Sequence, residues 1–250
     1  MASLSDMTRE RAAGHAPVLL QTIALTKRYS DQQALDDVSF DVREGEVLGL
    51  IGPNGAGKTT LLEAVAGLLP VDAGAVLWRG SPVSISRRRD VVFYLPDGLR
   101  PWDEQYVSRV LEFFAAVYGR SDEQVVGIIN AVCLAPVLHK RVSMLSKGFG
   151  RRLMLALALL TPQPLLLMDE PFDGFDLRQT REVMGLLRRV AEEGRTLVLA
   201  IHQLADAERV CDRFVLLAAG AIRGVGTLDE LRARAELPSA RLEDVFLALT

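Results

Sequence analysis

Residues 52–60 read Gly52-Pro53-Asn54-Gly55-Ala56-Gly57-Lys58-Thr59-Thr60 and fit the phosphate-loop pattern G-x-x-x-x-G-K-[ST]. The loop lies between an apolar stretch, 47–51, and a helix-like segment, 61–69. The glycines allow several backbone N–H groups to point at phosphate oxygens, and the following helix adds the positive end of its dipole. We therefore expect the loop to bind a nucleoside triphosphate, with Lys58 at the terminal phosphates and Thr59 at Mg²⁺.

The composition of the chain fits one large α/β domain. It has 250 residues, of which 49% are hydrophobic, so it can bury a substantial core. The net charge is only -3, and the nearest basic cluster is the three arginines at 87–89, so no nucleic-acid partner is expected. Cys133 and Cys211 have neither disulfide nor metal-site spacing, which suits a reducing compartment.

The apolar runs of the chain are short. Runs 153–160 and 214–222 fall below the roughly 20 residues that a membrane helix needs, so we expect no bilayer crossing by this chain. Residues 1–17 mix charged and small polar residues and lack the apolar segment of a signal peptide. We interpret them as a mobile tail.

The order of strand-like and helix-like segments predicts a layered α/β fold. Runs at 18–25, 34–42 and 47–50 alternate with polar turns, which predicts antiparallel strands that lead into the loop. Further strands are expected at 75–78 and 91–94, followed by helices at 103–118 and 122–132. Beyond them, strands at 165–168, 196–201 and 213–217 alternate with helices at 151–160, 177–192 and 204–209. This alternation favours a parallel sheet with helices on both faces.

Two adjacent carboxylates follow the apolar strand 165–168. Asp169 and Glu170 would lie at the carboxyl end of the sheet, where α/β folds bind ligands. Alone, the pair could be a polar turn at the end of a strand. After a phosphate loop, Asp169 suits Mg²⁺ held through water, and Glu170 suits orienting or deprotonating the attacking water.

Together these motifs resemble the nucleotide-binding subunits of ATP-binding-cassette (ABC) transporters, and the likeness extends over 18–250. The resemblance implies the α/β fold of a P-loop NTPase (RecA-like), with a mostly parallel core sheet, an antiparallel β layer and a helical subdomain insertion. It implies ATP and Mg²⁺ as cofactors. The expected division is a core of 18–96 and 144–232, a helical subdomain of 97–143 and a C-terminal helix in 233–250.

The resemblance also assigns residues outside the phosphate loop. Tyr29 corresponds to the aromatic residue that stacks on adenine, and His202 to the switch histidine that contacts the γ-phosphate and Glu170. Residues 145–149 correspond to the family signature, so Ser146, Lys147 and Gly148 should face ATP held by a second subunit. The implied assembly is a dimer, expected to be a homodimer, with Lys58, Glu170 and His202 as its catalytic groups.

The chain departs from the family pattern in three places, at position 97, in the signature and at position 173. Asp97 replaces a glutamine that touches Mg²⁺, and its carboxylate can ligate the ion or orient a water. Lys147 and Phe149 alter the signature, and the lysine resembles exporters of drugs, lipids or polysaccharides. Asp173 adds negative charge close to the expected dimer interface.

The resulting hypothesis is an ATP-hydrolysing subunit that powers an ABC exporter through separate membrane permease subunits, bound peripherally at the cytoplasmic face of the membrane. The helical insertion would dock the membrane subunit through Phe113, Phe114 and Tyr118. Two alternatives remain open: a soluble ABC-type ATPase clamp without a transporter, and a nucleotide-gated module with weak hydrolysis. The transported substrate is not encoded in this chain, because the permeation pathway belongs to another polypeptide.

Overall fold

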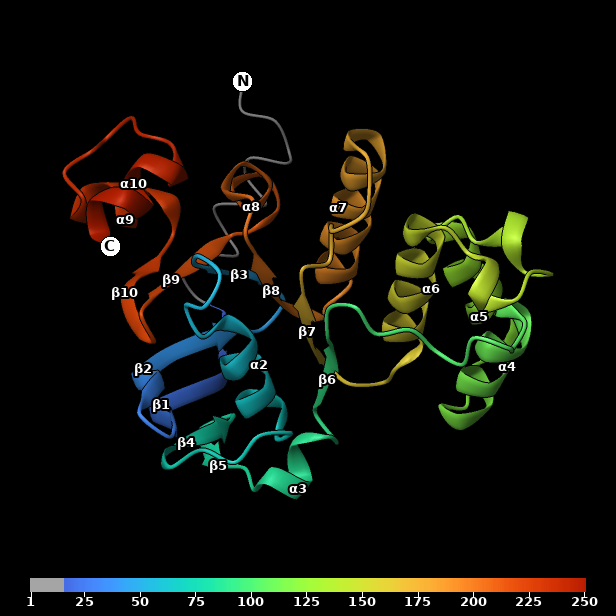
Figure 1. Ribbon diagram of the computed structural model, residues 1–250, viewed down its shortest axis with the longest axis horizontal. Coiled ribbons are helices and arrows are strands. Elements are labelled where there is room, and N and C mark those ends of the chain that lie inside the picture. Colours follow the sequence, from blue (N-terminus) through green and yellow to red (C-terminus); the bar gives the residue numbers. More distant parts are fainter. Residues whose placement is uncertain (1–15) are drawn as a thin grey trace.

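The computed structural model describes residues 16–250, which form two β-sheets with helices packed around them (Figure 1). Residues 1–15, which hold most of the tail expected at 1–17, lie outside the described residues. Among residues 16–250, none of the helices combines the length and the hydropathy that a membrane span requires.

The first sheet has four strands and is antiparallel throughout. Its spatial order is β2 (Gln32–Arg43), β1 (Val18–Tyr29), β4 (Ala73–Trp78) and β5 (Ser81–Pro82). A short helix, α3 (Ile85–Arg88), follows β5. The antiparallel pairing predicted for the first two strand-like runs is confirmed.

The second sheet has six strands and carries the phosphate loop. Its order is β10 (Ala221–Gly226), β9 (Arg213–Ala218), β3 (Val47–Ile51), β8 (Thr196–Ile201), β7 (Leu165–Asp169) and β6 (Val92–Leu95). All neighbouring strands are parallel except β10, which runs antiparallel to β9 at the edge. The expected parallel core is confirmed.

The antiparallel assignment of 47–50 was wrong. β3 lies inside the second sheet and pairs in parallel with both β8 and β9. All five of its residues are buried. An uninterrupted apolar run is typical of a strand covered on both faces, whereas an antiparallel layer with one open face alternates apolar and polar residues.

Two hydrophobic cores lie on opposite faces of this second sheet. Leu165 and Leu167 of β7 face the core shared with the antiparallel sheet and with α2 (Lys58–Ala66). Leu166 and Met168 face the core that contains α6 (Lys147–Leu160) and α7 (Leu177–Glu192). Successive side chains of a strand point to opposite faces, so both cores require β7 to be apolar at every position.

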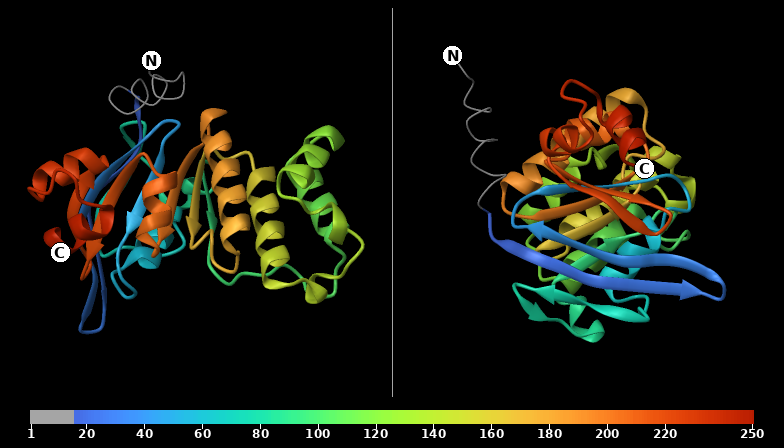
Figure 2. Two further views of the ribbon diagram at one scale, coloured as in Figure 1. Left: turned by 90° about the horizontal axis from the view of Figure 1, so that it is seen from above. Right: turned by 90° about the vertical axis from the view of Figure 1, so that its left-hand side faces the viewer.

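The remaining helices lie at the two ends of the molecule. Figure 2 shows α4 (Val107–Val117) and α5 (Asp122–Ala131) beside α6 at one end, opposite α9 (Leu228–Arg234) and α10 (Leu242–Leu249). Helix α8 (Leu204–Val210) packs against α7 and α10. Short 3-10 turns at Ala135–Val137 and Val142–Met144 lead from α5 to α6.

Several helix boundaries differ from the sequence-based ones because of capping. Helix α2 ends at Ala66, not at 69, because Gly67 adopts φ +80 and closes the last turn. Helix α6 begins at Lys147, not at 151, because the Ser146 hydroxyl accepts from the Phe149 N–H at 3.4 Å. The sequence did not predict β10 or α9, and 235–241 is not helical between α9 and α10.

A buried ion pair joins the two sheets. Arg213 at the start of β9 is 4% exposed, and its Nη1 lies 3.2 Å from Glu46 and 3.1 Å from Asp41 of β2. Burial raises the pKa of Glu46 even with this partner beside it. Removing the arginine would therefore leave a carboxylate in a site that disfavours its charge.

We expect Arg213→Met to lower the free energy of unfolding by about 3–5 kcal/mol, because a buried charge loses its partner. Urea denaturation followed by circular dichroism measures the change. The matched control is Arg109→Met, which breaks an exposed ion pair with Glu112 on α4 and should change stability by less than about 1 kcal/mol. Equal effects of the two substitutions would contradict the role given to Arg213.

Candidate functional site

The phosphate loop connects β3 to α2 and requires glycine at two positions for steric reasons. At Gly57 φ is +103, and a Cβ there would lie 2.4 Å from the carbonyl oxygen of Ala34. A Cβ at Gly52 would lie 2.3 Å from the carbonyl oxygen of Leu217. The loop therefore packs directly against neighbouring backbone, and this holds its own N–H groups in a fixed curve.

Lys58 folds back over the loop. Its Nζ donates to the carbonyl oxygens of Gly52 at 2.7 Å and Pro53 at 3.2 Å, and the residue is 7% exposed. Burial lowers the pKa of Lys58, although the charges of Glu170 and Asp169 act in the opposite direction. The loop thus holds a partly desolvated ammonium at its centre, where anionic oxygens would find a strong partner.

Thr59 and Asp169 bring two oxygen ligands together. The Thr59 hydroxyl donates to Oδ2 of Asp169 at 2.7 Å, and Asp169 is 4% exposed at the end of β7. In residues 16–250, no group of three or more His, Cys, Asp or Glu side chains is placed to hold a metal. One hydroxyl and one carboxylate fit Mg²⁺, which in phosphate-binding sites takes its other ligands from water and phosphates.

Glu170 and His202 form a second polar pair at the same sheet edge. Nδ1 of His202, which follows β8, lies 2.5 Å from Oε2 of Glu170. Glu170 follows β7 and adopts φ +49, in the left-handed region that a non-glycine residue enters at a cost of about 1–3 kcal/mol. Its N–H donates to the carbonyl oxygen of Ala200 at 3.0 Å. The surrounding strands therefore hold Glu170 in a disfavoured backbone conformation with its carboxylate oriented by an imidazole.

A groove of about 430 Å³ runs along these groups. Most of the residues predicted from the sequence line it: Tyr29, Pro53, Asn54, Gly55, Gly57, Lys58, Thr59, Thr60, Asp97, Asp169 and Glu170. Tyr29 is 46% exposed at the rim, with Lys27 Nζ 5.5 Å from its ring centre. The geometry combines an aromatic rim, a basic loop and a carboxylate pair in one groove.

Other predicted residues lie outside the lining of this groove. Gly52 supports the loop from beneath, Ala56 is 2% exposed in the hydrophobic core, and His202 reaches the groove through Glu170. Gln32 and Ala34 line the groove although the sequence did not point to them. Their position three and five residues after Tyr29, in the hairpin beside the rim, was the signal available in the sequence.

Ser146, Lys147 and Gly148 do not line the groove of their own chain. They form the N-terminus of α6, and Figure 1 shows β6 and β7 between α6 and α2. Ser146 and Lys147 are exposed. The structure therefore brings the phosphate loop and the carboxylates together. The signature residues lie outside this groove, at the N-terminus of α6.

Two of the unusual residues neutralise each other. Lys147 Nζ lies 2.8 Å from Oδ2 of Asp173, and its side chain crosses Gly174, where a Cβ would lie 2.8 Å from it. The hydrogen bond from Lys147 holds the pKa of Asp173 below its usual range, and the charges of Lys147 and Arg151 add to this. The lysine in the signature thus offsets the negative charge that Asp173 adds.

Asp97 has a partner in the same chain. Its Oδ1 accepts from Nη2 of Arg151 at 2.5 Å, and that nitrogen also donates to the carbonyl oxygen of Glu170 at 2.7 Å. Arg151 lies in the second turn of α6 and is 7% exposed. Asp97, like Asp173, is therefore paired with an opposite charge.

Comparison with known proteins identifies the family. A model of the ABC transporter family matches residues 35–173, more than half of the chain. The ABC-type transporter ATP-binding protein EcsA of Bacillus subtilis is 31% identical over 238 residues, which cover 93% of this chain and 96% of that protein. The Nod factor export ATP-binding protein I of Rhizobium etli is 35% identical over 204 residues, which cover 78% of this chain and 64% of that protein.

A solved structure agrees with these relatives. The structure of an ATP-binding subunit of an ABC transporter superposes with a TM-score of 0.84 at 31% identity, covering 92% of this chain and 99% of that one. The fold class and the family resemblance stated from the sequence are confirmed. The chain belongs to the ABC transporter family as an ATP-binding, ATP-hydrolysing subunit.

Proposed function

We propose that two copies of this protein bind two ATP·Mg²⁺ at shared sites and power an exporter whose permease subunits are separate polypeptides. One observation carries the proposal: the groove contains a phosphate loop and a carboxylate pair, while residues 146–148 lie outside its lining, with Ser146 and Lys147 exposed. In a two-fold dimer each copy can offer its α6 N-terminus to the groove of the other. Two identical chains would then complete two identical sites.

The roles within one site follow from the contacts. The loop N–H groups and Lys58 would bind the phosphates, and Thr59 and Asp169 would hold Mg²⁺, which supplies charge neutralisation at the transferred phosphoryl group. Glu170 would accept the proton of the attacking water, and His202 would keep that carboxylate oriented. The Arg151 contact of Asp97 favours a positioning role for Asp97 over direct ligation of the metal.

The exporter assignment rests on the relatives and on the signature. Two relatives carry export in their names. Lys147 resembles the signature of exporters with separate membrane subunits. We place the protein at the cytoplasmic face of the membrane, held there by the permease subunits, since ATP is a cytoplasmic substrate.

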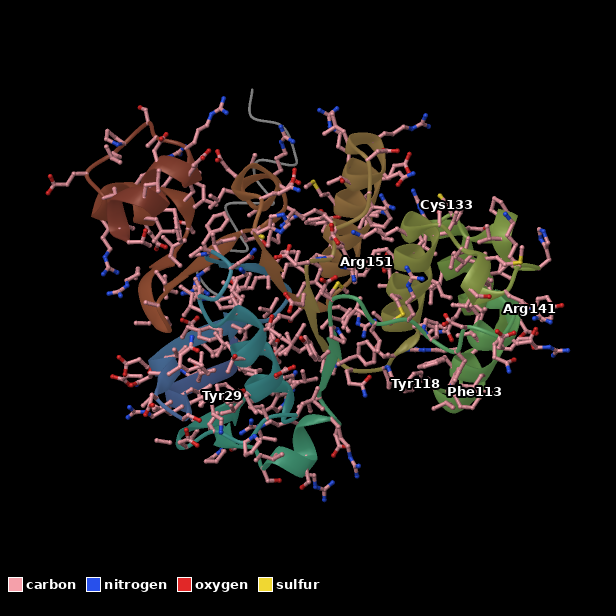
Figure 3. All side chains as sticks on the ribbon, viewed as in Figure 1. Tyr29, Phe113, Tyr118, Cys133, Arg141 and Arg151 are labelled. Carbon is pink, nitrogen blue, oxygen red and sulfur yellow. The ribbon has the colours of Figure 1, made fainter. Side chains whose placement is uncertain are left out.

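The helical insertion offers a surface for those subunits. Trp102 and Phe113 are 57% and 53% exposed, and their rings meet edge to face at 5.5 Å. Phe114 and Tyr118, also expected to dock, are half-buried against the core and support this aromatic patch. Figure 3 shows Phe113 and Tyr118 at the end of the molecule away from Tyr29. Exposed aromatic rings are typical anchors of protein interfaces.

Substitution of Glu170 tests the hydrolytic mechanism. Glu170→Gln should keep ATP affinity but slow phosphate release by roughly 10² or more, because the amide cannot accept the proton of water. An ATP-bound dimer should then accumulate, which size-exclusion chromatography measures. Lys58→Ala, the matched variant, should lose ATP affinity instead. Wild-type turnover in Glu170→Gln would sink the assignment of Glu170.

Substitution of Phe113 tests the docking surface. The tagged protein should retain an integral membrane protein with several spans from detergent-solubilised membranes of its own host, identified by mass spectrometry. Phe113→Asp should abolish this capture and leave the ATPase rate of the isolated subunit unchanged, because the ring is exposed and remote from the groove.

The control for this experiment is Ile23→Asp on β1 of the antiparallel sheet, where the Ile23 side chain is 47% exposed. This variant should capture the membrane protein as the wild type does. Recovery of no membrane protein by the wild type would favour a soluble clamp. Full capture by Phe113→Asp would exclude the aromatic patch as the docking surface.

A further inference from the structure

We propose that Arg151 is a positioning residue that holds Glu170 in its active conformation and links it to Asp97. The inference rests on the proposed role of Glu170 as the base that activates water. Arg151 itself lines no part of the groove, so it would act through Glu170 and not on the nucleotide.

The geometry joins three segments at a single nitrogen. Nη2 of Arg151, in the second turn of α6, donates to the carbonyl oxygen of Glu170 at 2.7 Å and to Oδ1 of Asp97 at 2.5 Å. An Nη atom carries two hydrogens, so both bonds can form at once. Figure 3 shows Arg151 between α6 and the strand β7 that ends beside Glu170. The guanidinium is 7% exposed, which leaves little room for other orientations.

Glu170 needs such a tether because its backbone is unusual. Its φ of +49 lies in the left-handed region, which residues other than glycine rarely adopt. The N–H side of the residue is fixed by the carbonyl oxygen of Ala200 at 3.0 Å. The carbonyl side is fixed by Arg151 and by the N–H of Asp173 at 3.1 Å. Loss of the arginine would leave the Asp173 N–H as the remaining donor to this carbonyl, so the strained backbone could relax and shift the carboxylate relative to His202.

Asp97 supplies the negative charge that holds the Arg151 guanidinium in position. A carboxylate accepts a stronger hydrogen bond from a guanidinium than a neutral amide does. Asp97 lies two residues after the end of β6 (Val92–Leu95), in the segment that leads to Trp102 and the aromatic patch. A displacement of that segment by a docked subunit would therefore reach the Glu170 carbonyl through one side chain. This accounts for an acidic residue at 97.

The test compares kcat and ATP affinity in a set of variants. Arg151→Met should lower kcat about tenfold or more and leave the Kd for ATP within about twofold, because only the reacting step depends on the placement of Glu170. Arg151→Lys should recover part of kcat, since an ammonium can still donate to the carbonyl. Arg188→Met, which breaks a partly buried pair with Asp212 beyond the groove, should keep the wild-type kcat.

The link to Asp97 is tested by a double-mutant cycle. Asp97→Asn should lower kcat less than Arg151→Met does, and the double variant should be no slower than Arg151→Met alone, because Asp97 acts through the arginine. Multiplicative losses would overturn the link. If Arg151→Met fails to fold, as its thermal unfolding would reveal, Arg151→Lys and Asp97→Asn decide the question: unchanged kcat in both overturns the proposal.

Different results would overturn the positioning role of Arg151 and the catalytic role of Glu170. A slow Glu170→Gln with a wild-type kcat in Arg151→Met would leave the function intact and overturn the positioning role. Normal turnover in Glu170→Gln would overturn the function on which that role rests.

Discussion

The hydrogen bond between Thr59 and Asp169 shows the constraint on which the site depends. The two residues are 110 positions apart in the chain, yet their oxygens lie 2.7 Å apart. They meet because β3 and β7 are parallel strands of one sheet with β8 between them, so the carboxyl ends of all three reach the same edge. The phosphate loop, the carboxylates and His202 follow these three strands. The register of these three strands therefore places the phosphate loop, Asp169, Glu170 and His202 next to one another.

Charge compensation is the second theme of the site. Asp97 is paired with Arg151, and Asp173 with Lys147, so each acidic departure from the family pattern has a basic partner within the chain. The partners come from the first two turns of one helix, α6. That helix thus neutralises the added negative charge at Asp97, which lines the groove, and at Asp173, three residues after Glu170. The pairs explain how a site with extra carboxylates can still suit an anionic ligand.

The sequence predicted the parts of the fold whose patterns are local. The bounds of α7 and β8 agree with the expected 177–192 and 196–201, because an amphipathic helix and a fully buried strand each leave a clear period. The apolar run of β3 is typical of a strand covered on both faces, but its residues could not show which strands it pairs with, since β8 and β9 lie far along the chain. Strand β10 was not predicted from the sequence, because its apolar pattern is interrupted by Arg223, Gly224 and Gly226.

The same distinction applies to the site. Motifs of a few adjacent residues located the loop and the Asp169–Glu170 pair, and the family resemblance located His202. The contacts of Arg151 could not be read from the sequence, because they join residues 54 and 19 positions away. Whether a charged residue is paired depends on tertiary packing, and periodicity carries no information about it.

The central claim is that one active site takes residues from two copies of the chain. The most direct measurement mixes two inactive variants: Lys58→Ala, which has a defective groove and an intact signature, and Gly148→Asp, which has an intact groove and a blocked signature. The mixed dimer contains one complete site, so phosphate release should reappear on mixing and rise with the fraction of mixed dimer. A mixture as inactive as its components, with mixed dimers shown to form, would contradict the claim.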